Sequence, residues 1–580
     1  KTGLDLECGS CYKSLKEAID KKLLTETDLD LALKRLFTTR FKLGMFDPAE
    51  MVPYAQIPYS VNNNAAHDYL ARVASQKSIV LLKNENQALP LSKNIKTLAI
   101  IGPNANDAQS LWGNYSGTPS NPITVLKGIQ NKLEPNTKIL YTKGTDLAKG
   151  ISEMKVIPSI CFQNENGIQG LTAAYYDNIK WEGTPLFTRT DDKIDFNWDI
   201  NTPDPRLKMG NYSIKWTGYL VVPKTGLYEI SEWSKPFMTI EIEGGKSSGG
   251  KNNHNPRIRT QKITLEAGKK YKIEAKYQNN YGNAIAQLLW AEPQENELQQ
   301  ATQIATQADA VVLVLGLNER LEGEEMKVEA DGFKGGDRTS LDLPANQEEL
   351  MKAMVATGKP VVLVLINGSA LSINWANDHV PAILTAGYPG QQGGNAIADV
   401  LFGDYNPAGR LPVTYYKSID QLPDFENYDM KGRTYRYFDK KPLYPFGFGL
   451  SYTKFKYSNL QIPTKISTEN DFEVLVDITN IGERDGDEVA ELYLKDEKAS
   501  TPRPIWQLEN FERIHLKKGE SKTVKFKITP RQLSMINKNG QRIIEPGWFT
   551  IAVGGKQPDG STDTQNTRFK ITNKSILLEK

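Results

Sequence analysis

The chain has 580 residues, of which 39% are hydrophobic and 24% are charged, and its formal net charge is +2 at pH 7. At about 150 residues per domain, this length predicts about four folded units. A net charge near zero provides no global field for nucleic acid, so we expect no nucleic-acid partner. The longest apolar runs, such as "AVVLVLGL", fall well short of the roughly 18 residues that span a bilayer, so we expect no membrane span.

The N-terminal segment "KTGLDLECGSCYKSL" has neither an initiator Met nor the profile of a signal peptide, so it carries no information on export, and we expect that the chain begins within a longer protein. Cys8 and Cys11 form a C-x-x-C pair, and Cys161 is isolated. A zinc site would need a second half-site, and the sequence offers none. We therefore expect structural or incidental cysteines.

The segment "TETDLDLALKRLFTTRFKLGMFDP" predicts a helix. It contains a capping-box pattern from Thr27 to Asp30, and Gly44 and Pro48 provide a stop signal. Its apolar residues fall on one helical face: Leu29, Leu33, Leu36, Phe37 and Phe41. The following stretch, to about residue 75, is rich in Pro, Asn and Tyr and predicts a connector.

Short apolar strands and helical patterns alternate over residues 76–155 and again over 296–450, which is typical of an α/β domain. The strands are predicted in "KTLAIIGPN", "TKILYTKG", "DAVVLVLGL", "KPVVLVLING" and "PAILTAGY". The two stretches together predict one interrupted domain. The interruption, residues 156–295, consists of short alternating strands with Gly, Pro and Asn turns, and it predicts an all-β insert.

Residues 451–580 form a second all-β region, in which Phe472, Val474, Val476 and Ile478 alternate with more polar positions. The spacing of its strands is typical of a β-sandwich. The fold class is therefore multidomain, α/β plus all-β.

Several kinds of chemistry find no support in the motifs. The four histidines, His67, His254, His379 and His515, fall in different segments without metal-ligand spacing. The stretch "GNYSG" lacks the G-x-S-x-G order of a serine hydrolase. No Walker A motif is present, and Tyr452 occupies the position of the third glycine of a dinucleotide fingerprint.

An acidic stretch directly follows the strand "DAVVLVLGL". Its carboxylates are Glu322, Glu324, Glu325, Glu329, Asp331 and Asp337. Loops that leave the carboxyl ends of strands in open α/β sheets are where ligands bind, which favours a functional site. A solvated acidic loop and a fortuitous Ca²⁺ site are the alternatives.

The whole chain resembles the C-terminal portion of a family 3 glycoside hydrolase of the β-glucosidase and β-xylosidase type. The motifs that carry the resemblance include "GLDLECG", "FKLGMFDP", "GNYSG", "YPGQQGGNAIADVLFGDYNPAGRLPVTY", "GRTYRY" and "LYPFGFGLSYTKF". The insert resembles a PA14 domain through "WTGYLVVPKTGLYEI", and residues 451–580 resemble the fibronectin type III-like domain of the family.

The resemblance implies that residues 1–50 are the C-terminal end of a (β/α)8 barrel, that residues 51–75 are a linker and that the interrupted domain is an α/β sandwich. It also implies a retaining mechanism, with two carboxyl groups about 5 Å apart on opposite sides of the glycosidic bond. The family pattern places the general acid/base on Glu324, in "LEGEE" upstream of "GGDR", with Glu322 as the second candidate. The nucleophilic aspartate of the family lies before "GLDLECG", so we expect it outside this chain, on a missing N-terminal barrel that is covalently joined or associated.

We therefore expect an exo-acting β-glucosidase or β-xylosidase that acts on oligosaccharides, with this chain inactive when isolated. Two carboxyl groups and water suffice for the reaction, so no metal or organic cofactor is expected. The family's role in polysaccharide breakdown implies a periplasmic or secreted protein. The alternative is a non-catalytic carbohydrate-binding or adhesive protein, because PA14-like and fibronectin-like domains also occur in such proteins.

Overall fold

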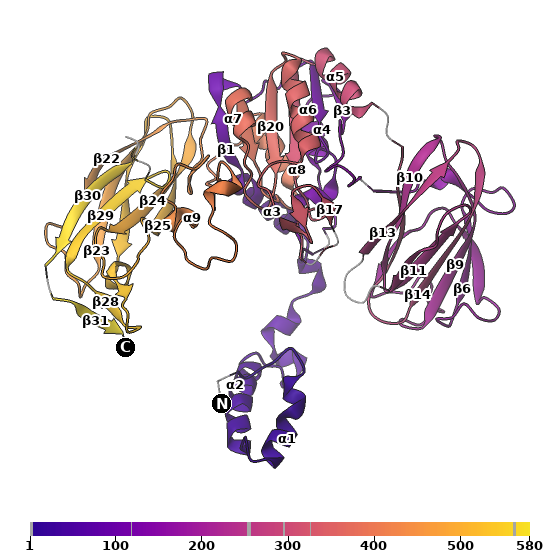
Figure 1. The fold of residues 1–580 in the computed structure, drawn as a ribbon, viewed down its shortest axis with the longest axis horizontal. Helices are drawn as coiled ribbons and strands as arrows, with labels where there is room; N and C mark the ends of the chain where they lie inside the picture. The colour runs from indigo at the N-terminus through magenta and orange to yellow at the C-terminus, as the bar shows by residue number, and fades with distance from the viewer. Residues whose placement is uncertain are drawn as a thin grey trace. The chain divides into compact units, whose positions relative to one another are not determined.

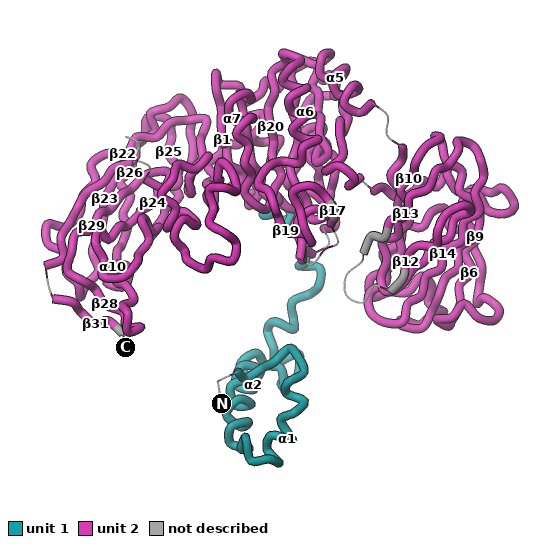
Figure 2. Tube along the Cα trace, viewed as in Figure 1, with its two compact units in different colours: residues 1–71 teal, residues 72–580 magenta. Residues whose placement is uncertain are grey.

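The computed structural model describes most of the chain and divides it into two compact units, residues 1–71 and 72–580 (Figure 2). The described residues are 4–117, 119–152, 154–251, 257–293, 296–324, 326, 328–558, 560, 564–572 and 574–579. Glu325 and His254 lie outside them, and so does the side chain of Glu329.

The first unit is helical. Its elements are η1 (Cys11–Ser14), α1 (Leu15–Asp20), α2 (Glu26–Lys42), η2 (Ala49–Met51), η3 (Pro53–Gln56) and η4 (Tyr59–Val61), and α3 (Ala65–Ser78) follows across the boundary. The capping box of α2 is formed by Thr25 and Asp28, two residues before the expected pair. The expected box from Thr27 to Asp30 is wrong, because Thr25 is the residue with extended backbone and its side chain accepts from the Asp28 amide.

None of the described residues of the first unit is buried. The predicted apolar face of α2 leaves Phe37 40% and Phe41 66% exposed, although both rings contact Phe46. Short helices gain most of their stability in proteins from packing of an apolar face. The described part of this unit therefore has no hydrophobic core of its own.

Helix α3 lies partly in the stretch that we expected to be an irregular connector. Its C-terminal half belongs to the second unit, where Arg72 and Gln76 both donate to the buried carboxylate of Asp399. Lys132 also pairs with Asp399, and these partners lower the pKa of Asp399 against the effect of its burial. The helix therefore ends as an integrated part of the α/β domain.

A six-stranded sheet forms the centre of the α/β domain, in the order β1-β21-β20-β16-β2-β3 (Figure 1). The strands are β1 (Val80–Asn84), β2 (Thr97–Ile101), β3 (Lys138–Thr142), β16 (Ala310–Gly316), β20 (Val361–Ile366) and β21 (Ala382–Thr385). All neighbours are parallel except β1, which is antiparallel to β21. Strands β16 and β20 are buried at every residue, which explains their unbroken Val and Leu runs.

Helices cover both faces of this sheet. They are α4 (Val125–Lys132), α5 (Glu297–Gln307), α6 (Ala345–Ala356), α7 (Asn374–His379) and α8 (Gly393–Leu401). Val311, Leu313 and Leu315 of β16 share one core with α5, α6 and α7. The intervening Val312 and Val314 share the other core with α4 and α8. The result is a three-layer α/β/α sandwich.

The strand order reverses direction between β2 and β16. Along the chain, β3 follows β2 on one side, whereas β20 and β21 follow β16 on the other side. In open α/β sheets, ligands bind in the crevice outside the carboxyl ends of the two strands at such a switch point. The loops after β2 and β16 are therefore the expected position of a ligand site.

Between β3 and α5 lies a domain of β-strands around a core of buried aromatic residues that includes Tyr175, Tyr212, Trp216 and Tyr277. One of its sheets has the order β13-β10-β15-β4, with β8 also paired to β15, and the other has the order β12-β11-β14-β9-β6-β7, with β5 also paired to β9. The elements are β4 (Lys155–Val156), η7 (Ser159–Cys161), β5 (Phe162–Gln163), β6 (Leu171–Tyr176), β7 (Phe187–Asp191), β8 (Asp195–Asp199), β9 (Tyr212–Val221), β10 (Gly226–Lys235), β11 (Phe237–Ile242), β12 (Ser248–Lys251), β13 (Arg257–Leu265), β14 (Lys270–Asn279) and β15 (Ala284–Ala291).

The C-terminal region packs two sheets, β22-β23-β26 and β25-β24-β29-β30, around one core, with a small sheet β27-β28-β31. Its elements are β22 (Phe455–Gln461), β23 (Phe472–Asn480), β24 (Gly486–Asp496), β25 (Gln507–Leu516), β26 (Ser521–Ile528), α10 (Pro530–Leu533), β27 (Met535–Ile536), β28 (Arg542–Ile544), β29 (Gly547–Gly554), β30 (Gln565–Ile571) and β31 (Ile576–Glu579). The predicted alternation in β23 is confirmed, because its even positions are buried.

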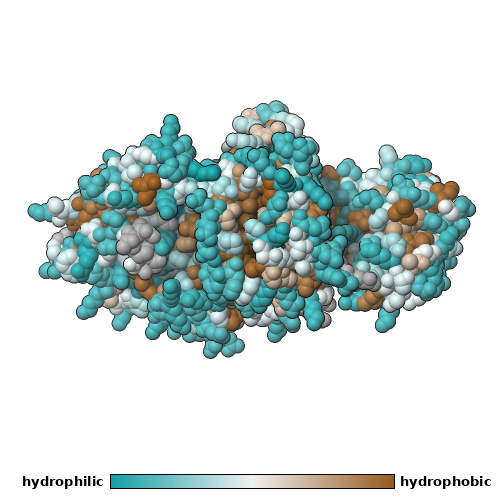
Figure 3. Space-filling view, turned by 90° about the horizontal axis from the view of Figure 1, so that it is seen from above, coloured by the Kyte–Doolittle hydropathy of each residue, from teal (hydrophilic) through white to brown (hydrophobic). Residues whose placement is uncertain are grey.

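The remaining short elements are η5 (Glu85–Gln87), η6 (Ala108–Leu111), β17 (Glu329–Ala330), β18 (Phe333–Lys334), β19 (Asp337–Arg338), η8 (Ile419–Gln421) and α9 (Thr434–Tyr437). The face in Figure 3 is mostly hydrophilic, with hydrophobic residues in separate groups. Among the helices that the structure describes, none is long and apolar enough to cross a membrane. The fold class expected from the sequence, mixed α/β with a C-terminal β-sandwich, is confirmed.

Candidate active site

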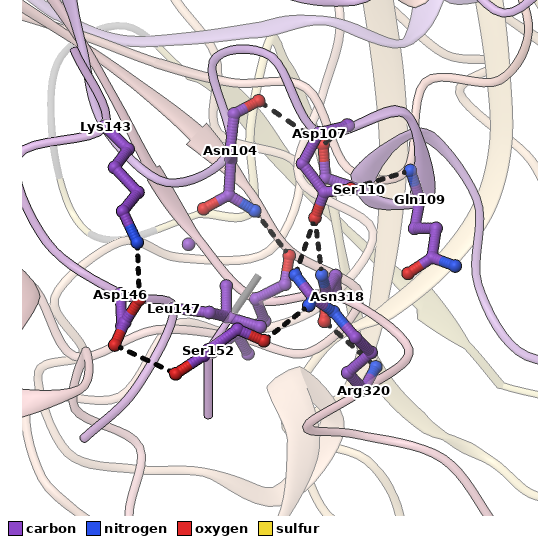
Figure 4. Close-up of polar contacts among 12 residues, drawn as sticks. Asn104, Asp107, Gln109, Ser110, Lys143, Asp146, Leu147, Ser152, Asn318 and Arg320 are labelled. Atoms are coloured by element: carbon purple, nitrogen blue, oxygen red, sulfur yellow. Dashed lines mark hydrogen bonds and ion pairs between the residues drawn. The ribbon is translucent and has the colours of Figure 1, made fainter. Parts of the chain in front are cut away.

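Two loops meet at the switch point, one after β2 and one after β16. The buried Asn104 of the first loop donates through Nδ2 to the Leu317 carbonyl of the second loop, at 2.9 Å. Asn318 and Arg320 donate to the Asp107 carboxylate at 2.8 and 3.0 Å (Figure 4). These contacts fix the start of the acidic stretch against the loop after β2.

Asp107 also organises its own loop. Its side chain accepts from the Gln109 amide at 3.0 Å and so caps η6, which leads directly to Trp112. Arg320 makes a second contact through Nη1, to the Ser152 carbonyl at 3.1 Å. Ser152 in turn contacts Asp146, which pairs with Lys143 (Figure 4). The charges around Asp107 are therefore held in a network that joins three loops.

Glu322 accepts four hydrogen bonds. Its Oε1 accepts hydrogen bonds from the amides of Gly368 and Ser369, at 3.0 and 3.2 Å, and from the hydroxyl of Tyr388, at 2.6 Å. Its Oε2 accepts a hydrogen bond from the Ser369 hydroxyl at 2.6 Å. Burial, with the nearby Glu322 charge, raises the pKa of Tyr388. Gly368 and Ser369 follow β20, Tyr388 follows β21, and Glu322 itself follows β16. The hydrogen bonds of Glu322 therefore connect the loops after three neighbouring strands.

Arg338 lies beside this cluster. Its guanidinium donates to the Ser369 hydroxyl at 2.8 Å and to the carbonyls of Ser340 and Asp342. Burial lowers the pKa of Arg338, while the charge of Glu322 acts in the opposite direction. The "DR" pair downstream of the acidic stretch thus contributes its arginine to the surroundings of Glu322, whereas Asp337 is exposed.

Glu324 has a different environment, because its side chain is exposed. The hydroxyl of Tyr115, itself 75% exposed, donates to Oε2 of Glu324. The preceding Gly323 is fixed by its amide, which donates to the Gly336 carbonyl at 3.3 Å. A carboxyl group that reaches solvent from a fixed backbone can exchange a proton with a bound molecule.

Sequence reasoning missed Glu319. Burial raises the pKa of Glu319 to about 7, and the neighbouring Asp107 adds to this rise, whereas the Trp112 indole and Arg320 oppose it. A carboxyl group that titrates near neutral pH in a ligand crevice is a candidate functional group. The signal in the sequence was the position of Glu319, three residues after the buried strand β16.

A hollow of about 290 Å³ lies beside these loops, lined by Trp112, Gly117, Pro119, Gly390 and Gln391. Backbone contacts fix its walls, because the Gly390 amide donates to the Leu111 carbonyl at 2.7 Å and the Ile123 amide donates to the Gln391 carbonyl at 2.9 Å. Pockets with aromatic walls and a few polar groups are typical ligand sites. Sequence reasoning had missed Trp112 as well.

The structure also describes three of the histidines and the three cysteines, none of which the sequence favoured for catalysis or metal binding. His379 stacks on Trp375, and His515 contacts Asp487. Cys8 and Cys11 are exposed thiols, and Cys161 is a buried one. Within the described part of the chain, no group of three or more His, Cys, Asp or Glu side chains could hold a metal ion.

Two family models match the chain. Residues 79–452 match the glycosyl hydrolase family 3 C-terminal domain, and residues 488–557 match a fibronectin type III-like domain. A xylan 1,4-beta-xylosidase from Xylanibacter ruminicola is 36% identical over 96% of this chain and 64% of its own length. A periplasmic beta-glucosidase from Salmonella typhimurium is 31% identical over 96% of this chain and 58% of its own length.

A solved structure supports the same family relationship. The beta-glucosidase from Kluyveromyces marxianus in complex with glucose aligns with all of this chain and 71% of its own, with a TM-score of 0.77 and 26% sequence identity. The chain spans 64% and 57% of the lengths of the xylosidases from Xylanibacter ruminicola and Formosa agariphila. Because the family model covers more than half of the chain, and the Xylanibacter relative is 36% identical to it, the chain belongs to glycosyl hydrolase family 3.

Proposed function

We propose that this chain carries the acid/base part of an exo-acting, retaining β-glycosidase, with Glu324 as the general acid and base. The observation that carries the proposal is the contrast between the exposed Glu324 and the enclosed Glu322 on one loop at the switch point. Both oxygens of Glu322 accept hydrogen bonds from amide or hydroxyl donors, so this carboxylate is suited to organising loops. Glu324 reaches solvent, where a glycosidic oxygen can approach it.

The proposed reaction has two steps. In the first, the neutral Glu324 carboxyl donates its proton to the glycosidic oxygen while an aspartate bonds to the anomeric carbon, and the bond to the leaving alcohol breaks. In the second, the Glu324 carboxylate takes a proton from water, whose oxygen attacks the anomeric carbon and releases the aspartate. The phenol of Tyr115 donates to Oε2 and orients the Glu324 carboxyl group.

The nucleophilic aspartate, in this proposal, comes from an N-terminal barrel that is covalently joined to this chain or associated with it. Two observations support such a partner. The chain spans only 64% of the Xylanibacter xylosidase, and none of the described residues before Arg72 is buried. Residues 1–50 would then be the end of the barrel, and the 580-residue chain by itself would be inactive.

The substrate in this proposal is an oligosaccharide with a terminal β-xylosyl or β-glucosyl residue at its non-reducing end. The relatives include enzymes named for each sugar, and the Xylanibacter xylosidase has 36% identity against 31% for the Salmonella glucosidase. We also propose that the β-domain between β3 and α5 is PA14-like, and that the protein is periplasmic or secreted. The name of the Salmonella relative supports the location.

The proposal is tested by hydrolysis of nitrophenyl β-xyloside and β-glucoside with the 580-residue chain and with a version extended upstream through a complete barrel. Activity is expected only in the extended version. There, Glu324→Gln should lower the rate on xylobiose by about 10²–10⁴-fold, while azide should accelerate turnover of the nitrophenyl substrate because an anion needs no general base.

Glu322→Gln serves as the matched control, since it changes the same type of side chain two residues away. It should lower thermal stability and give no azide response. Azide rescue in Glu322→Gln rather than in Glu324→Gln would reverse the two roles. Sugar binding without turnover in every form would favour the non-catalytic, carbohydrate-binding alternative.

A further inference from the structure

The hollow beside the switch point is built by loops that follow two strands, β2 and β21. Trp112, Gly117 and Pro119 belong to the loop after β2, whereas Gly390 and Gln391 belong to the loop after β21. Its volume of about 290 Å³ is near the lower end of the range of small-molecule sites, about 300–1,000 Å³. The hollow therefore suits a single small ring.

Hydrogen bonds hold the walls of this hollow in place. Oε1 of Gln391 accepts from the Ser120 amide at 3.0 Å, which fixes the segment that contains Pro119. On the other side, Asp107 caps η6, and η6 leads directly to Trp112. A site whose walls are already ordered loses little conformational freedom when a ligand binds.

The lining indicates what kind of ligand would fit. Trp112 provides an aromatic wall, Pro119 a saturated ring and Gln391 a polar side chain, and none of the five lining residues is charged. The π face of an indole carries partial negative charge and attracts the weakly positive C–H groups of a saturated ring. At Gly117 an added Cβ would meet no atom of the described residues within 4 Å, so the backbone there is open to close approach by a ligand. This chemistry fits a neutral sugar ring.

The hollow also lies close to the proposed acid/base along the chain. Trp112 is three residues before Tyr115, whose hydroxyl donates to Glu324, and three residues span at most about 11 Å. Between them, Gly113 packs on the Tyr388 ring, where an added Cβ would lie 3.0 Å from the ring. A general acid protonates the oxygen of the leaving group, so the leaving group lies next to it. A short leaving-group saccharide at Glu324 can therefore reach the hollow.

We propose that this hollow binds a neutral sugar ring of the leaving group, with Trp112 as the wall on which the ring stacks. Trp112 is then a specificity-determining residue that favours oligosaccharides over glycosides of small alcohols. The role of the ligand as a leaving group rests on the proposed function, whereas binding of a saccharide at Trp112 needs no turnover.

The direct test is fluorine NMR of the complete 580-residue chain labelled with 5-fluorotryptophan, with the Trp112 signal assigned by its loss in Trp112→Phe. Xylotriose is the probe, because its neutral rings can bind without being hydrolysed. We expect a saturable shift of the Trp112 signal with a dissociation constant in the millimolar range. A Trp112 signal that stays constant up to the solubility limit of xylotriose would overturn the proposal.

Trp548 is the internal control, since its side chain is 42% exposed on β29 of the C-terminal β-sandwich. Its signal should stay constant, and equal shifts of both signals would mean unspecific contact with exposed indoles and overturn the proposal. Pro119→Ala removes the second apolar wall and should weaken binding severalfold. An unchanged dissociation constant in folded Pro119→Ala would place xylotriose outside the hollow and also overturn the proposal.

Kinetics of the extended enzyme test the leaving-group role. Trp112→Ala should raise KM for xylotriose about 2–10-fold, the range expected for one aromatic contact, and leave kcat unchanged. KM for methyl β-xyloside should stay constant, because its methanol leaving group is too short to reach the hollow. Trp112→Phe, which keeps a smaller aromatic wall, should lie between wild type and Trp112→Ala. If Trp112→Ala fails to fold, Pro119→Ala replaces it, and an equal rise in KM for both substrates would overturn the leaving-group role.

The outcomes separate this proposal from the proposed function. If xylotriose is hydrolysed and the variants at Trp112 leave its KM unchanged, the hollow does not bind the leaving group and the proposed function stands. If xylotriose shifts the Trp112 signal but no extended form hydrolyses it, the hollow is a saccharide site and the proposed function fails.

Discussion

The hydroxyl group of Tyr388 donates to Oε1 of Glu322 across 2.6 Å and joins the loop after β21 to the loop after β16. Tyr388→Phe removes this donor and leaves the other three donors of Glu322 in place. We expect a loss of about 1.5–3 kcal/mol in unfolding free energy, the range of one hydrogen bond to a charged acceptor. Chemical denaturation of the α/β domain measures it.

Glu322→Gln should cost more than Tyr388→Phe, because several donors then face a neutral amide. The double variant separates the two effects. Equal losses in the single variants and strict additivity in the double variant would contradict the view that Glu322 organises these loops as a charged acceptor.

Gly336 is the second sensitive point of the acidic stretch. Its φ is +96°, and a Cβ atom there would lie 1.8 Å from the Gly323 carbonyl oxygen. Gly336→Ala should therefore destabilise the protein by at least about 1–3 kcal/mol and displace the backbone before Glu324. Gly335→Ala is the control, since its φ is +65° but its nearest contact would be at 3.7 Å, so it should cost less. The thermal midpoints of the two variants provide the comparison.

The buried Glu491 in β24 should make the free energy of unfolding depend on pH. It accepts from the Tyr493 hydroxyl at 2.5 Å, and burial raises its pKa to about 7, with Arg410 opposing and Glu488 adding to the rise. Between about pH 4.5 and pH 7 the folded state keeps this proton while the unfolded state loses it, so stability falls as pH rises through this window.

The fall attributable to Glu491 should be on the order of 3 kcal/mol, complete above about pH 7, and absent in Glu491→Gln. Thermal midpoints measured from pH 5 to pH 8 check this, with the exposed Glu512→Gln as the control. Parallel curves for wild type and Glu491→Gln would show that Glu491 is already ionised in the folded protein.

Hydrogen exchange should distinguish the two units. In the isolated chain, the amides of α1 and α2 should exchange within the shortest labelling times, because these helices bury no apolar residues. The same amides should be protected in a version extended through a complete barrel, whereas β16 and β20 should be protected in both. Strong protection of α2 in the isolated chain would remove this support for a missing partner.

The sequence predicted the parts of the fold that depend on local pattern. Unbroken apolar runs identified β16 and β20, since strands buried on both faces need apolar residues at every position. Alternation identified β23, which is buried on one face. The capping box of α2 was misplaced, because both Thr25 and Thr27 are followed three residues later by an aspartate and only the backbone conformation distinguishes them.

The local amino-acid composition did not predict helix α3. The stretch before residue 75 is rich in residues that favour turns, and its helix is fixed by contacts of Arg72 and Gln76 with Asp399, more than 320 positions away in the chain. Such contacts leave no periodic signal in the local sequence, so tertiary structure overrides the local preference.

The sequence by itself determined that carboxylates follow a buried strand of an α/β domain, and motif resemblance assigned them to a glycosidase family. The family pattern ranked Glu324 before Glu322, and only the tertiary structure showed how their surroundings differ. Glu322 is enclosed because Ser369 and Tyr388, 47 and 66 positions further on, lie beside it across the sheet. Glu319 titrates near neutral pH because the chain returns after the long insert and places β16 next to β2. Burial and charge depend on neighbours in space, and the strand order of the sheet decides which residues those neighbours are.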